Sequence, residues 1–99
     1  MSVLTGKEEI TFLRKRIDAI DAQIMKLLSE RVNLSKEIGK TKGKSNKPIL
    51  DAKREAVIYE KIEECSKELM MNPEDCVIVF KEIIRMCRNA QEDIKTKTA

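Results

Sequence analysis

Residues 10–38 read ITFLRKRIDAIDAQIMKLLSERVNLSKEI. Apolar residues recur in this stretch at steps of three and four, the pattern of an amphipathic helix with a heptad seam. The seam consists of Ile10, Leu13, Ile17, Ile20, Ile24, Leu27, Leu34 and Ile38. Between Leu27 and Leu34, the seam position is held by Arg31. Because a guanidinium keeps its charge, burying it requires an anion beside it. The pattern therefore predicts a helical core that holds something polar.

Turn and cap signals divide the chain into three helices, expected over about residues 8–42, 51–70 and 73–94. Gly, Asn and Pro between residues 43 and 48 break the first helix. Asp51 is a good N-cap for the second helix, and Asn72 followed by Pro73 begins the third. The tail, residues 95–99, is expected to fray. The sequence predicts an all-α fold in a single domain, residues 1–99.

The predicted helices differ in length. At ~1.5 Å per residue the first is about 50 Å long and each of the others about 30 Å. A single chain would leave much of the heptad seam in water. A homodimer in which two long helices pack together would cover it. The alternative is a monomer whose first helix frays at one end.

Charge and aromatic content argue against a nucleic-acid partner. The net charge is +3, and acidic residues are interspersed with basic ones along most of the chain. The basic run from Lys40 to Lys47 is better interpreted as a solvated loop. Phe12, Tyr59 and Phe80 are the aromatic residues, too few for a platform on which bases stack.

Cysteine usage and hydropathy favour the cytoplasm. The three cysteines lack CxxC spacing, and the chain contains no histidine, so we expect neither a metal site nor a disulfide framework. No apolar run approaches the roughly 18 residues of a membrane span, and the first nine residues lack the apolar stretch of a signal peptide. Without histidine, a reaction that needs no proton transfer suits the chain best.

Three cations on the first helix are candidates for binding an anion. Arg31 and Lys42 lie three helical turns apart on nearly one face and could hold opposite ends of a small dianion. Arg14 lies 28 positions before Lys42, about 42 Å along a helix. The two can serve one pocket only if Arg14 comes from a second, antiparallel chain. Taken alone, Lys42 could also be a solvated residue that the helix dipole favours at this end.

Two later residues also break local rules. Arg54 falls in the first turn of the second helix, where the dipole disfavours a cation, and neutralisation by Glu55 is the simplest interpretation. Gln91 lies on an apolar stripe, where it is either part of a site or a core amide bonded to another side chain. The stripe consists of Val77, Phe80, Ile84, Cys87, Gln91 and Ile94.

Five segments in register resemble the all-helical chorismate mutases. The resemblance spans about residues 8–94 and is completed by Gln91. It implies an intertwined homodimer with two active sites and an isomerase that converts chorismate to prephenate, on the route to phenylalanine and tyrosine, without a cofactor. The segments are residues 13–18 (LRKRID), 29–31 (SER), 38–42 (IGKTK), 48–51 (PILD) and 54–55 (RE).

The resemblance also implies roles for individual residues. Arg14 from the partner chain and Arg31 would bind the two carboxylates of the substrate. Lys42 and Gln91 would be the catalytic residues, on either side of the ether oxygen where negative charge develops. The reaction is a Claisen rearrangement, in which a C–O bond breaks as a C–C bond forms, and it requires no acid, base or metal.

The remaining substrate-binding residues follow from the same resemblance. Glu55 and the backbone near Asp51 would accept the ring hydroxyl, with support from Arg54. Cys87 departs from the family pattern, because it stands where a small hydroxyl residue often holds a carboxylate and a thiol is a weak donor.

Three alternatives remain open at this stage. Two are enzymes on the same fold, an isochorismate pyruvate lyase and a mutase for an amino-substituted chorismate, although Glu55 and Asp51 suit a ring hydroxyl. The third is a helical dimeric interaction module, which would not explain Arg31 and Gln91 within apolar stripes. Because the sequence ends soon after the third helix, we expect no fused domain.

Overall fold

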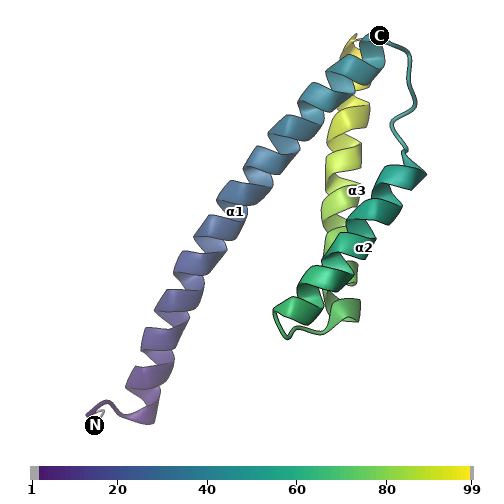
Figure 1. The fold of residues 1–99 in the computed structure, drawn as a ribbon. Helices are drawn as coiled ribbons and strands as arrows, with labels where there is room; N and C mark the ends of the chain where they lie inside the picture. Colours follow the sequence, from purple (N-terminus) through teal and green to yellow (C-terminus); the bar gives the residue numbers. More distant parts are fainter. Residues whose placement is uncertain (1–2, 99) are drawn as a thin grey trace. The chain divides into compact units, whose positions relative to one another are not determined.

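The computed structural model describes residues 3–98 and consists there of three helices and no strand (Figure 1). They are α1 (Gly6–Lys44), α2 (Ala52–Glu68) and α3 (Pro73–Thr98). The predicted all-α class is confirmed. The prediction that the tail frays is wrong for residues 95–98, which continue α3. Lys95 anchors this last part, since its Nζ donates to the carbonyl of Lys47 at 2.6 Å; Ala99 lies outside the described residues.

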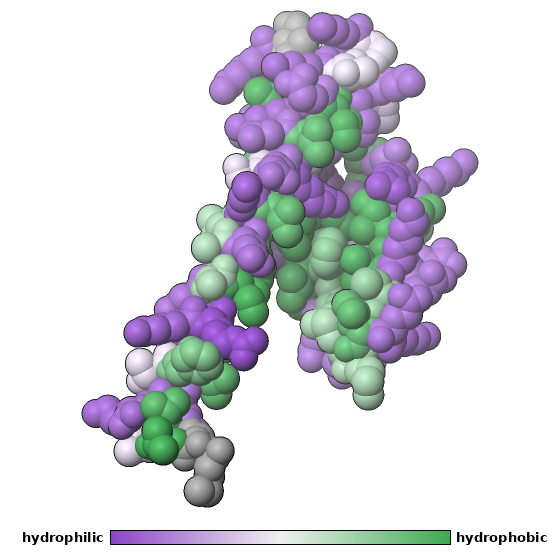
Figure 2. All heavy atoms as spheres, turned by 60° about the vertical axis from the view of Figure 1, so that its left-hand side comes forward, coloured by the Kyte–Doolittle hydropathy of each residue, from purple (hydrophilic) through white to green (hydrophobic). Residues whose placement is uncertain are grey.

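Contacts within the chain divide it into two compact units, Met1–Glu30 and Arg31–Ala99. In the first unit, Thr5 caps α1: its Oγ1 accepts from the N–H of Glu8 at 3.1 Å. The seam residues of this unit, from Ile10 to Leu27, are between 48% and 63% exposed. Figure 2 shows hydrophobic side chains open to solvent along this helix. Among residues 3–98, this part of the seam is therefore left about half exposed.

The second unit contains the C-terminal part of α1 together with α2 and α3. Helices α2 and α3 form a hairpin and contact each other (Figure 1). Both predicted N-caps are present: Asp51 Oδ1 accepts from the N–H of Arg54 at 3.0 Å, and Asn72 Oδ1 from that of Asp75 at 3.1 Å. The buried hydrophobic residues of the described chain are Ile49, Ile84 and Cys87.

The turn between α2 and α3 contains a residue in the left-handed region. Met70 has φ 57° and is 94% exposed. Its N–H donates to Lys67 O at 3.1 Å, and that of Met71 donates to Ser66 O at 2.8 Å. This pair of bonds is a Schellman C-cap, in which glycine usually occupies the position that Met70 holds here.

Helix α1 lies close to α3 at Gly39, which is buried. A Cβ added at Gly39 would lie 2.7 Å from the carbonyl oxygen of Gln91 and 2.9 Å from its Cα. Only a glycine fits between these two backbones. The contact fixes where Gln91 stands relative to the end of α1.

None of the helices in the described residues is long and apolar enough to cross a membrane.

Candidate active site

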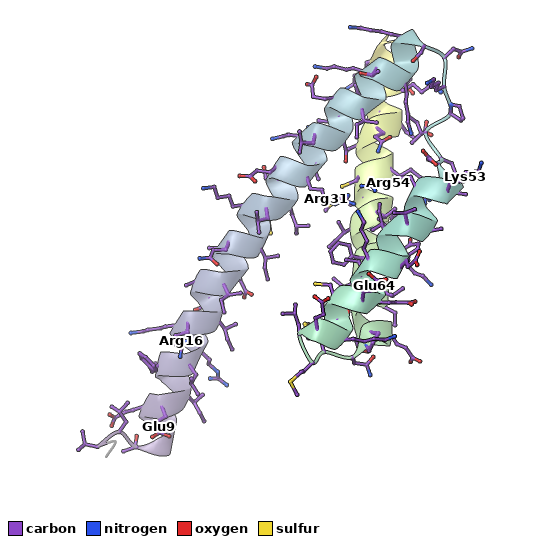
Figure 3. All side chains as sticks on the ribbon, in the orientation of Figure 1. Glu9, Arg16, Arg31, Lys53, Arg54 and Glu64 are labelled. Carbon is purple, nitrogen blue, oxygen red and sulfur yellow. The ribbon has the colours of Figure 1, made fainter. Side chains whose placement is uncertain are left out.

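A cavity of about 390 Å³ lies within the Arg31–Ala99 unit. Its volume falls in the range of small-molecule sites. Figure 3 shows Arg31 on α1 and Arg54 on α2 reaching toward α3, whereas Lys53 points away. Seven of the residues predicted from the sequence line this cavity: Arg31, Lys42, Asp51, Arg54, Glu55, Cys87 and Gln91. The structure thus brings seven of the eight predicted residues together, while their roles remain predictions.

Arg14 is the predicted site residue that does not line this cavity. It belongs to the Met1–Glu30 unit, where it is exposed. Its assignment to a site on a partner chain therefore remains a proposal.

Cations outnumber carboxylates around the cavity. Each cation favours a bound anion, and the effect is strengthened where water is excluded. An excess of two positive charges matches a small dicarboxylate. The cations are Arg31, Lys42, Arg54 and Arg88, and the carboxylates are Asp51 and Glu55.

Lys42 is held in place by the backbone of the connection between α1 and α2. Its Nζ donates to the carbonyl oxygen of Ile49 at 2.9 Å, in a part-buried setting. Ile49 is only 5% exposed, so this carbonyl is itself well fixed. An ammonium has three N–H donors, and the bond to Ile49 uses one. The other two would remain for a ligand, and the part-buried bond counts against the interpretation of Lys42 as a merely solvated helix end.

Glu55 forms an ion pair with Arg88, a residue that the sequence reasoning missed. Arg88 Nη2 donates to both carboxylate oxygens of Glu55, at 2.7 Å each. Neutralisation of Arg54 by Glu55 is therefore not what the structure shows. Adjacent residues on a helix do not face each other, whereas α3 packs across α2 and brings Arg88 to Glu55. Arg88 follows Cys87, on the flank of the apolar stripe, a position that carries no signal in the sequence alone.

Two buried polar atoms at the cavity have no hydrogen-bond partner within residues 3–98. They are Nε of Arg88 and Oε1 of Gln91, one helical turn apart on α3. Buried polar atoms are normally paired, so unpaired ones call for an explanation. The interpretation of Gln91 as a core amide bonded to another side chain finds no support at this oxygen. Cys87, one turn before Gln91, is 2% exposed.

These features define a class of protein. It is an all-helical domain with a cationic cavity suited to a small polyanion and lined by an ammonium and an amide. Residues 13–92 match the family model for chorismate mutase type II. The chain belongs to this family.

The sequence matches to two relatives extend over almost the whole chain. It is 42% identical over 91 residues to the bifunctional chorismate mutase/prephenate dehydratase of Aquifex aeolicus, a match that covers 89% of this chain and 25% of that protein. It is 32% identical over 91 residues to the chorismate mutase of Methanocaldococcus jannaschii, covering 92% of each. The chain thus spans a quarter of the first relative and nearly all of the second.

Proposed function

We propose that this chain is a chorismate mutase that converts chorismate to prephenate in the cavity of the Arg31–Ala99 unit. The observation that carries the proposal is the grouping of Arg31, Lys42 and Gln91 around one cavity in a member of the type II family. Both relatives are named as chorismate mutases, which favours chorismate over isochorismate as the substrate.

The rearrangement makes limited demands on the protein. It is one pericyclic step within a single molecule, so no group has to take or give a proton. The site has to hold the dicarboxylate in its compact conformation and stabilise the charge that builds on the departing ether oxygen. Removing one such preorganised donor typically lowers the rate about 10²–10³-fold.

The cavity offers a residue for each of these tasks. Arg31 would bind one carboxylate through its guanidinium. Lys42, oriented by the Ile49 carbonyl, and the amide of Gln91 would donate to the ether oxygen. Glu55, whose carboxylate is held by Arg88, would accept a hydrogen bond from the ring hydroxyl.

We propose further that the active enzyme is a homodimer. The half-exposed seam on α1 supports this, because apolar surface of this extent is seldom left open to water. Packing two such helices together would bury the seam of each. It would also bring Arg14 of one chain to the cavity of the other, where it would bind the second carboxylate. Free thiols at all three cysteines are consistent with a cytoplasmic location.

Turnover is tested by the loss of chorismate absorbance with the purified protein, with isochorismate assayed in parallel. We expect chorismate to be consumed and prephenate to be the product. Absence of turnover would refute the proposed activity, and release of pyruvate from isochorismate would favour the lyase.

The shared site is tested by mixing two inactive variants. Arg14→Ala and Arg31→Ala should each lose most activity when assayed alone. If Arg14 acts in the partner's site, a mixed dimer contains one intact site and one doubly defective site. Random exchange makes half of the dimers mixed, so about a quarter of the wild-type activity should return. No recovery after chains have demonstrably exchanged would refute the shared site.

A change of Arg31 to leucine separates the enzyme from an interaction module. Arg31→Leu would complete the heptad seam, so dimerisation should be kept or strengthened. Turnover should nevertheless be abolished, because the carboxylate loses its guanidinium. A variant that dimerises and still turns over chorismate at the wild-type rate would contradict the assignment of Arg31.

A further inference from the structure

We propose that Arg88 is a positioning residue of this site, which holds the Glu55 carboxylate and cancels its charge so that a dianionic substrate can bind beside it. The inference rests on the proposed function.

The ion pair is built into the packing of α2 and α3. Its partners are 33 residues apart in sequence, and the pair joins the two helices at the cavity. The side chain of Glu55 is 18% exposed and that of Arg88 36%. A contrasting pair on the same helix, Arg85 with Glu82, joins neighbours three residues apart and is 59% and 67% exposed. The first pair is part-buried, while the second is exposed to water.

Glu55 creates an electrostatic problem that Arg88 solves. A largely buried carboxylate lining a cavity repels a dianion, and such like-charge contacts weaken binding strongly. Neutralisation by Arg88 removes most of this repulsion.

The geometry leaves Glu55 usable as an acceptor. A single nitrogen, Nη2, serves both carboxylate oxygens at 2.7 Å, so each oxygen keeps a lone-pair direction free. Glu55 can therefore accept a hydroxyl hydrogen bond while its charge stays balanced. Because the free substrate and its transition state carry the same net charge, loss of this balance should weaken the binding of both alike.

The test is a double-mutant cycle on Arg88 and Glu55, with KM and kcat measured for chorismate. We expect Arg88→Met to raise KM about 10–100-fold, with a smaller change in kcat, because Glu55 is left as an unbalanced charge. Glutamine at position 55 carries no charge, so in the Glu55→Gln background the same Arg88→Met change should alter KM less than about threefold. Arg88→Lys should restore part of the loss.

Arg85→Met is the matched control. It removes the same charge from the same helix, at an exposed position outside the cavity, and should leave KM unchanged. If Arg88 bound substrate directly, Arg88→Met would raise KM equally in both backgrounds. If Arg88 had only a structural role, the melting temperature would fall while KM stayed constant.

An equal rise of KM in both backgrounds, or a lower melting temperature at constant KM, overturns the inference and leaves the proposed function intact. Absence of wild-type turnover overturns both. Should Arg88→Met fail to fold, the comparison of Arg88→Lys in the two backgrounds decides the same question.

Discussion

Gly39→Ala tests whether the contact between α1 and α3 controls catalysis. The added Cβ would stand 2.7 Å from the carbonyl oxygen of Gln91, and the atoms it meets all belong to the backbone of α3. A backbone atom within a helix cannot turn aside as a side chain can. The contact is about 0.7 Å short of ordinary van der Waals distance, so the two helices have to separate by about that amount.

The separation acts on the two residues proposed to flank the ether oxygen. Lys42 follows Gly39 by three positions on α1, and Gln91 is the very residue the new methyl group meets. Misplacement of a catalytic group by about 1 Å can cost about 10²-fold in rate. We expect kcat for chorismate to fall about 10–100-fold.

Stability should change much less than the rate. Overpacking costs about 1–3 kcal/mol, while the better helix propensity of alanine returns about 1 kcal/mol. A net loss of about 1 kcal/mol lowers the melting temperature by about 4–8 °C in a domain of this size. Melting curves should be compared at equal protein concentration, because dimerisation makes the midpoint depend on it.

Gly6→Ala provides the control on the same helix. A Cβ at Gly6 meets no atom within 4 Å, so this variant should keep both the wild-type rate and the wild-type melting temperature, or melt slightly higher. Should Gly39→Ala keep kcat within twofold and melt no lower than the wild type, the role assigned to the Gly39 contact would be wrong.

Two other substitutions test the donor at the ether oxygen and the turn after α2. Gln91→Glu should lose activity near pH 7 and regain it at acidic pH. An amide donates a hydrogen bond at any pH, whereas a carboxyl group, with an ordinary pKa of about 4.3, donates only when protonated. A pH–rate profile parallel to that of the wild type would contradict this prediction. Met70→Gly should raise the melting temperature by several degrees, since a non-glycine residue in the left-handed region costs about 1–2 kcal/mol and glycine loses part of that gain to unfolded-state entropy. Asn46→Gly is its comparison, because asparagine tolerates φ 54° better and should gain less; a larger gain at Asn46 would count against the argument.

Local signals predicted the helices well. The caps at Asp51 and Asn72 and the break after α1 depend on residues that act on their immediate neighbours, and both caps are confirmed. The end of α3 was missed, and the bond that Lys95 makes there goes to a carbonyl 48 residues away, which local signals do not reveal.

The cavity could be predicted only in part. Arg31 and Gln91 stood out because each interrupts an apolar stripe. Lys42 followed from its helical spacing to Arg31, and the family resemblance supplied Asp51 and the role of Glu55. Arg88 interrupts no pattern, since a cation beside a buried stripe is unremarkable until the partner across the hairpin is known. Gly39 likewise appears as an ordinary helix glycine until its distance to Gln91 is measured.

Two rows of residues on α1 meet at Arg31. In the part of α1 after Glu30, the buried residues are Ser35 and Gly39, whereas the seam residues Leu34 and Ile38 are 66% and 48% exposed. The face that packs within the chain therefore follows Arg31, Ser35 and Gly39 at steps of four, and its small residues let α3 approach. The seam residues Leu34 and Ile38, displaced by one position, line the cavity as well, and their exposed parts stay available for a second chain. Arg31 stands where the two rows converge, so one guanidinium lies at once beside the cavity and on the proposed dimer face.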